Sequence, residues 1–372
     1  MDRFFSRRWS AWAAVWISLV LTAQCLHAKP APEQKNFSRE AMLRDLAQKV
    51  IAPGYARLAA NCRMLADNIE AFNASPDQAA LDRARASWNA AFVAADSLRC
   101  FQTGPVAERQ LVSTFYYWQA APNRIEAIVK DPSQTIDQTL LDNVGATVKG
   151  LYAMEYFLFD RRGGQLAEPP DSARALDLLT ASPRRRAYLL ALARDADGKA
   201  GQLAADWSAT GPQSAAEKFA AGGQASLNLL VNQLTQSIEN TLQNHLQLTL
   251  ALAAPVDRQL NRIKGGRSGS SLQSVVVALE SVDRFYRGEN GLGLRDSVNR
   301  LNPALGARVQ DKLTAAIAAA REIGEPLERA AVDKRAALQN AVDQAHEMEV
   351  LFKVDLVSAL GVTITFTSGD SD

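Results

Sequence analysis

The sequence is poor in the residues that build most zinc sites and disulfide frameworks. It has three histidines and three cysteines in 372 residues, with no CxxC pair and no HExxH motif. Zinc ribbons and thioredoxin-like folds need cysteine pairs, and zinc peptidases usually need two histidines one helical turn apart. Strand patterns are also scarce, because only residues 362–366 alternate β-branched side chains with a period of two. These absences exclude both cysteine-based folds and favour a helical chain.

An excess of charge of one sign is missing as well. The chain has 41 Lys and Arg against 40 Asp and Glu, which gives a formal net charge of +1. Proteins that bind nucleic acid through phosphates need an excess of cations to displace condensed counterions. We therefore expect no nucleic-acid partner.

The N-terminal segment, residues 1–28, has the pattern of a secretory signal peptide. Three arginines precede an apolar run over 9–21, and small residues follow it, with cleavage expected after Ala28 and Ala23 as an alternative. Its removal takes away three Arg and one Asp, which changes the formal net charge from +1 to about −1. We expect a periplasmic or otherwise secreted protein. An uncleaved anchor or lipid attachment at Cys25 would instead associate it with a membrane, although Gln24 is unusual before a lipid-bearing cysteine.

Two cysteines remain in the mature chain, Cys62 and Cys100. Thiols exported to an oxidising compartment often pair, so we expect a disulfide between them. The alternative is two buried thiols that act as small hydrophobic side chains.

Helical periodicity runs through nearly the whole mature sequence, so the fold class is all-α, with helices long enough for bundles. Residues 160–172 (DRRGGQLAEPPDS) combine glycine, proline and charge and indicate a loop between two halves, while 264–271 (KGGRSGSS) indicate a flexible connection inside the second half. We predict domains over 29–170 and 171–372. The helix expected near 183–207 fits either side of this boundary.

The stretch VKGLYAMEYFLFD, residues 148–160, holds the candidate site. Tyr152 and Glu155 are three apart and share a helix face. A phenolate and a carboxylate are ligands suited to Fe(III). The alternative is an ordinary buried helix in which the Tyr152 hydroxyl bonds a neighbour such as Glu155. Because a buried glutamate needs a partner, we considered three cations for Glu155: Arg124, Arg295 and Lys353.

The same stretch resembles the GxHxxE motif of the imelysin-like family, once classed as insulin-cleaving metallopeptidases. Gly150 and Glu155 match the motif, and Tyr152 replaces its histidine. Further similar pieces follow the family's order: WNAAFVAADSLRCFQTGPV, FYYWQAAPNRI, YRGENGLGLRDSV and LFKVDLVSALGVTITFTSGDSD. The resemblance implies two helical bundles of four helices related by duplication, a short extended C-terminal tail, and a cleft between the bundles lined by the motif helix. It also implies a link to iron-regulated systems.

From these features we expect a periplasmic binding or accessory protein that serves iron or other metal handling through the interdomain cleft. Glu155 and Tyr152 are the tentative ligands of iron or another divalent or trivalent metal, Gly150 is structural, and the implied partners are envelope metal-uptake proteins. An envelope interaction module without metal is the alternative. Peptidase activity is disfavoured because the motif lacks its histidine, and because two mature histidines, His245 and His346, exclude a three-histidine site.

Overall fold

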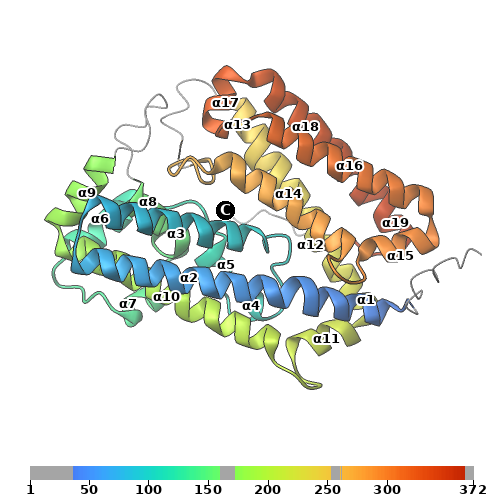
Figure 1. Ribbon diagram of the computed structural model, residues 1–372, viewed down its shortest axis with the longest axis horizontal. Coiled ribbons are helices and arrows are strands. Elements are labelled where there is room, and N and C mark those ends of the chain that lie inside the picture. The colour runs from blue at the N-terminus through green and yellow to red at the C-terminus, as the bar shows by residue number, and fades with distance from the viewer. Residues whose placement is uncertain (1–36, 160–171, 253–259, 261, 365–372) are drawn as a thin grey trace, which may run out of the picture. The chain divides into compact units, whose positions relative to one another are not determined.

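The computed structural model describes residues 37–159, 172–252, 260 and 262–364, and its regular structure is helical (Figure 1). No strand occurs within these ranges, which confirms the all-α prediction. Residues 362–364 at the predicted C-terminal tail are non-helical, and the rest of that tail lies outside the described residues.

Seven helices of sixteen residues or more make up the frame, and shorter helices and π-helical turns connect them. In chain order the elements are α1 (Arg39–Leu46), η1 (Ala47–Ile51), α2 (Ala52–Ala74), α3 (Gln78–Asp96), α4 (Pro105–Glu108), α5 (Val112–Phe115), α6 (Pro122–Lys130), α7 (Gln138–Asn143), η2 (Ala146–Val148), α8 (Gly150–Leu158), α9 (Ser172–Ala181), α10 (Pro183–Ser208), α11 (Ala215–Ala221), α12 (Gly223–Thr241), η4 (Leu242–Gln247), α13 (Leu248–Ala251), α14 (Ser271–Arg287), α15 (Leu294–Leu301), α16 (Pro303–Glu322), α17 (Leu327–Asp333), α18 (Arg335–Val350), η6 (Leu351–Leu356) and α19 (Val357–Leu360).

Local sequence explains where the frame helices begin and end. The Asp77 side chain accepts a hydrogen bond from the Ala80 backbone N–H at 2.7 Å, so an N-cap starts α3. Gly288 ends α14 with φ of +78°, a left-handed conformation that glycine adopts without steric penalty.

The seven frame helices and the shorter α8 form two groups that share one apolar core. Helices α2, α3, α8 and α10 pack together in the first group, and α12, α14, α16 and α18 in the second. In Figure 1 the first group is blue to green and the second yellow to red, and α3 packs against α14 between them. A single cluster of buried apolar side chains extends through both groups. Helix α10 follows the predicted boundary near residue 170 but packs on α2, while the division into two domains remains a prediction.

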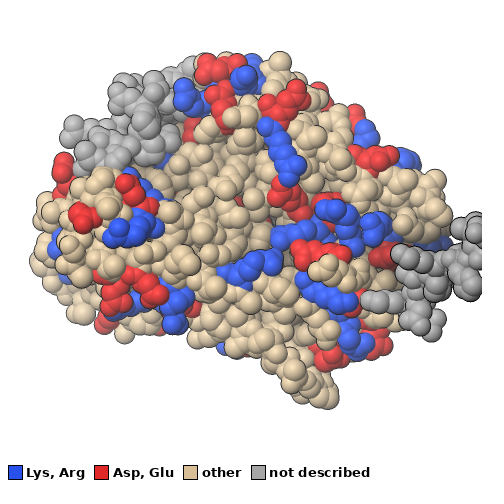
Figure 2. Space-filling model, viewed as in Figure 1, with Lys and Arg blue, Asp and Glu red and all other residues tan. Residues whose placement is uncertain are grey.

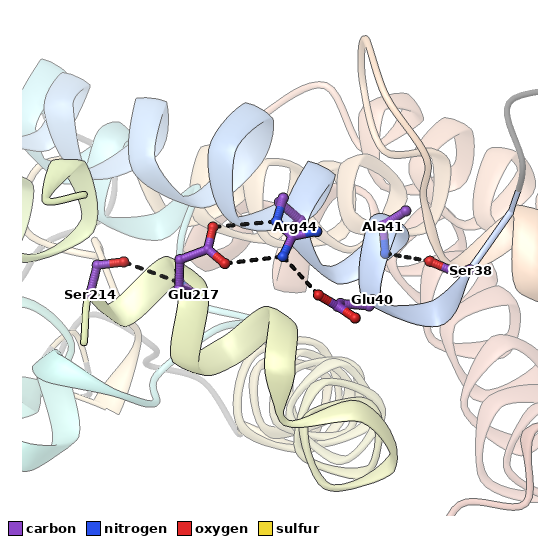
Figure 3. A network of polar contacts seen from close by, with 6 residues as sticks. All are labelled: Ser38, Glu40, Ala41, Arg44, Ser214 and Glu217. Atoms are coloured by element: carbon purple, nitrogen blue, oxygen red, sulfur yellow. Dashed lines mark hydrogen bonds and ion pairs between the residues drawn. The ribbon is translucent and has the colours of Figure 1, made fainter. Parts of the chain in front are cut away.

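Helix α1 is tied to α11 by an ion pair (Figure 3). The Arg44 guanidinium donates from Nε and Nη2 to the two carboxylate oxygens of Glu217, at 3.3 and 3.0 Å, and Nη2 also donates to Glu40 at 2.8 Å. Hydrogen bonding to Arg44 lowers the pKa of Glu217. Ser38 and Ser214 cap the two helices, so these contacts anchor the start of the described chain.

The visible surface carries mixed charge. In Figure 2 Lys and Arg are interspersed with Asp and Glu on the face shown, as the near-neutral composition leads one to expect. Among the described helices, none combines the length and apolarity needed to cross a bilayer.

The expected disulfide is wrong: Cys62 and Cys100 are both free thiols in the structure. Cys62 lies on α2 near Asp197 of α10, whereas the Cys100 sulfur lies 2.8 Å from the Ser281 hydroxyl oxygen of α14. Burial raises the pKa of each thiol to about 12. The two side chains have different neighbours, and the structure agrees with the alternative of two buried thiols.

This arrangement predicts how the thiols react. A chain beginning at Lys29, purified without reductant, should bind almost no thiol reagent while folded, because both thiols are buried and protonated. In denaturant it should bind reagent at both Cys62 and Cys100. A colorimetric thiol titration with and without denaturant, using a reduced sample as control, measures this. Unreactive cysteines in the denatured, unreduced sample would instead show a disulfide.

Candidate functional site

Helix α8, which carries the motif, begins at Gly150 in a conformation that requires glycine. Gly150 has φ of +76°. A Cβ at this position would lie 2.3 Å from the Thr114 carbonyl oxygen, much closer than any real contact. The absence of a side chain thus lets the start of α8 press against the backbone of α5.

Tyr152 is part of the packed core. Its side chain is 2% exposed and its ring meets that of Phe92 edge to face, with centroids 6.1 Å apart. The hydroxyl has no hydrogen-bond partner among the described residues. Burial, reinforced by the negative charge of Asp96, raises the pKa of Tyr152 well above its usual 10. The phenol is therefore protonated, and it is not hydrogen-bonded to Glu155 as the sequence had allowed.

Glu155 is buried as expected, and its contacts include a serine. The Glu155 Oε1 atom accepts hydrogen bonds from the Ser268 backbone N–H at 2.9 Å and from the Ser268 hydroxyl at 2.8 Å. Ser268 lies in the turn that precedes α14. Lys353, one of the proposed partners, binds Glu239 and Glu349 instead. The motif glutamate therefore connects α8 to the segment that leads into the second group of helices.

A second buried carboxylate, Asp96 at the end of α3, forms an ion pair with Lys264. Asp96 is fully buried and Lys264 is 1% exposed. The Ser274 hydroxyl donates to the other carboxylate oxygen of Asp96 at 2.6 Å. Burial and the nearby charge of Arg99 lower the pKa of Lys264 to about 7, although Asp96 acts in the opposite direction. Two carboxylates of the first group are thus bound by residues 264–274.

The sequence analysis missed both members of this ion pair. Residues 264–271 had the composition of a flexible connection, yet the segment holds the contacts of Asp96 and Glu155. The available signal was a lone acid, Asp96, within the otherwise apolar stretch AAFVAADSL. An isolated charge on an apolar helix face is retained only with a partner. The sequence around Asp96 does not indicate which residue is that partner.

Arg99 and His245 extend the polar region on the other side of Lys264. His245 is in the π-helical turn η4, 3% exposed, with its ring centroid 5.5 Å from that of Trp118. Burial, together with the charges of Arg99 and Lys264, lowers the pKa of His245 well below its usual 6.5, so the imidazole is neutral. Its Nε2 atom has no partner among the described residues. We refer to Asp96, Arg99, Tyr152, Glu155, His245 and Lys264 as the polar centre.

The polar centre does not fit a bare metal ion. No group of three or more His, Cys, Asp or Glu side chains is placed to hold a cation within the described part of the chain. Lys264 and Ser268 occupy oxygens of Asp96 and Glu155, and Tyr152 is protonated. A cation needs lone pairs that are not already engaged. The tentative site formed by Glu155 and Tyr152 therefore stays a prediction, and we derive no chemistry through a metal there.

The unbonded hydroxyl generates a stability prediction. Replacing Tyr152→Phe removes a buried polar atom without a partner, so the free energy of unfolding should stay unchanged or rise by up to about 1 kcal/mol. The control is Tyr188→Phe, because the Tyr188 hydroxyl donates to the Val148 carbonyl at 2.7 Å and its loss should destabilise by about 1 kcal/mol. Urea unfolding of the protein and the two variants measures both. Equal destabilisation by both substitutions would contradict the absence of a partner for Tyr152.

Comparison with known proteins gives three results. The imelysin family model (peptidase M75) matches residues 51–351. A solved structure named as a candidate iron-regulated protein A precursor, from Parabacteroides distasonis, superposes with a TM-score of 0.71 at 18% identity, over 90% of this chain and 97% of that one. An imelysin-like protein from Psychrobacter arcticum superposes with a TM-score of 0.67 at 17% identity, over 89% and 99% of the two chains.

No curated protein matches. The two solved structures share the fold, and the family model spans most of the chain, including the motif helix α8. The all-helical architecture and the match over 51–351 agree with the resemblance carried by Gly150, Glu155 and the C-terminal Ala-Leu-Gly. The chain belongs to the imelysin family.

Proposed function

We propose that this protein is an exported, non-catalytic binding protein with an accessory role in iron handling, and that it binds its ligand at the polar centre. The observation that carries this proposal is that five of the fourteen buried polar atoms without a hydrogen-bond partner among the described residues lie in or beside the polar centre: Arg99 Nη1, Tyr116 OH, Trp118 Nε1, Tyr152 OH and His245 Nε2. Each such atom costs roughly 1–3 kcal/mol of stability when it is left unpaired. Several of them together in one region are typical of a site that a ligand completes.

The link to iron and the exported location rest on separate support. The related structure from Parabacteroides distasonis is named for iron regulation and as a precursor. Residues 1–28 of this chain have the sequence pattern of a signal peptide. Both points favour a role in the periplasm, with envelope metal-uptake proteins as partners.

Peptidase chemistry has little support from the side chains. A zinc peptidase needs a metal-bound water and a carboxylate base. The motif histidine is replaced by Tyr152, His346 is on the exposed face of α18 beside Glu349 at 3.4 Å, and His245 is buried and neutral. The competing function is an envelope interaction module without metal, which the same replacement by Tyr152 favours.

The test of the proposed function is cell-associated iron. A strain lacking the gene should contain less iron than the parent in iron-poor medium, and wild-type protein should restore it. Arg99→Gln should restore it poorly, because it removes a buried cation of the polar centre, and Arg109→Gln, at an exposed arginine outside the centre, should restore it fully. Elemental analysis of washed cells measures this. Equal iron in the deletion strain and the parent, in both iron-poor and iron-rich media, would refute the accessory role.

Metal analysis of the purified mature protein distinguishes a protein that holds no metal ion of its own from one that binds iron directly through Tyr152 and Glu155. We expect less than one equivalent of Fe(III), Fe(II) or Zn(II) after dialysis, with no difference between the wild type and Glu155→Ala. Stoichiometric iron that is lost in both Glu155→Ala and Tyr152→Phe would instead establish a phenolate and carboxylate metal site.

A further inference from the structure

A cavity opens beside the polar centre, where the segment after α3 meets the segment after α5. Its volume is about 530 Å³, and its walls include Arg99, Gln102, Ser113, Tyr116, Trp118 and Asn240. Cavities of roughly 300–1,000 Å³ are typical of small-molecule sites. The cavity is therefore large enough for a compact ligand.

Arg99 differs from the other buried cations. Three cationic side chains are buried among the described residues: Arg99, Arg185 and Lys264. Arg185 binds Glu126 at 2.5 Å, and Lys264 binds Asp96. Arg99 is 5% exposed, and its Nη1 atom has no hydrogen-bond partner among the described residues. The Arg99 guanidinium carbon also makes a cation–π contact, 5.9 Å from the centroid of the Trp118 ring.

A buried guanidinium nitrogen without a hydrogen-bond partner is costly, and a ligand with acceptor oxygens would remove that cost. Guanidinium groups are suited to carboxylate and phosphate because their N–H groups match two oxygens at once. The Arg99 guanidinium lies over the Trp118 ring, and both side chains line the cavity. The charge of Arg99 also depresses the pKa of Lys264 and His245, which a bound anion would offset.

The polar atoms next to Arg99 are also suited to a ligand that carries acceptor oxygens. Trp118 Nε1 can only donate, and it has no partner within the described ranges. The Tyr116 hydroxyl, in a side chain that is 4% exposed, has no close hydrogen bond among the described residues and interacts with the Tyr55 hydroxyl. Burial, the neighbouring Tyr55 and the charge of Asp96 raise the pKa of Tyr116 well above its usual value, so it keeps its proton. The cavity therefore offers hydrogen-bond donors, which suit an acceptor-rich ligand and not a cation.

We propose that Arg99, Tyr116 and Trp118 form an oxyanion-binding site that takes a small carboxylate- or phosphate-bearing ligand. This inference rests on the proposed function and names the ligand class of the same region. It also reconciles an iron-related role with a centre that does not fit a bare cation, because ferric iron held by a carboxylate chelator is an oxygen-rich complex that can carry negative charge. The shared chemistry is the oxyanion, and the free anion and the ferric complex are its two sources.

Isothermal titration of the mature protein, residues 29–372, tests this proposal. The probes are sodium phosphate, sodium citrate and preformed ferric citrate, at constant pH and ionic strength, with sodium chloride as the blank. We expect at least one probe to bind one-to-one at concentrations up to about 1 mM. Citrate binding with or without iron would identify the free carboxylate as the source, and binding of ferric citrate alone would identify the chelate.

Variants assign the binding to the cavity. Arg99→Gln should lower the affinity for the probe roughly tenfold or more, since it removes charge-assisted hydrogen bonds. Arg99→Lys should have an affinity between those of the wild type and Arg99→Gln, because it keeps the charge without the forked geometry. Tyr116→Phe should lower the affinity several-fold. The control is Arg109→Gln, because Arg109 lies outside the cavity walls and is 48% exposed in an ion pair with Asp206. Circular dichroism checks that each variant is folded.

Two results would overturn the inference: no probe binds the wild type, or Arg99→Gln and Arg99→Lys both bind as tightly as the wild type. These outcomes are separate from the cell-iron test. Lost iron in the deletion strain with no oxyanion binding would leave the accessory role standing and remove the oxyanion site. Binding without an iron phenotype would keep the site and remove the iron role.

Discussion

The ion pair between Asp96 and Lys264 is the contact around which the polar centre is organised. Two charges leave water only when their attraction and further hydrogen bonds offset the loss of hydration, and here Ser274 supplies a second contact to the Asp96 carboxylate. The pair joins the end of α3 to the segment before α14. Glu155 and Ser268 add a second connection, from α8 to that same segment. The packing of α3 on α14 is thus reinforced by polar contacts at its end.

This arrangement decides what the centre can do. Asp96 and Glu155 already accept hydrogen bonds or an ion pair, so their oxygens are poorly placed to hold a metal or to act as a general base. What remains without a partner in the described structure is mainly donors, with Arg99 foremost. A site rich in donors and poor in free acceptors is suited to binding an anion.

Helical periodicity was enough to predict the fold class and the shared, buried face of Tyr152 and Glu155. It was not enough to predict contacts between distant segments. The partner of Glu155 was sought among cations and proved to include Ser268, in a segment whose composition resembled a flexible linker. Cys62 and Cys100 were expected to pair, but contact α10 and α14 respectively. Periodicity defines the face a side chain occupies, whereas the element covering that face depends on tertiary packing.

A double-mutant cycle on Asp96→Asn and Lys264→Met tests the central role of the ion pair most directly. Each single substitution leaves a buried polar group without its partner and should lower the free energy of unfolding by about 3 kcal/mol or more. The double variant should lose much less than the sum, with a coupling of about 2 kcal/mol or more. The exposed pair of Arg63 and Asp197, 2.7 Å apart, is the control and should couple far more weakly. Additive effects of Asp96→Asn and Lys264→Met would contradict the account.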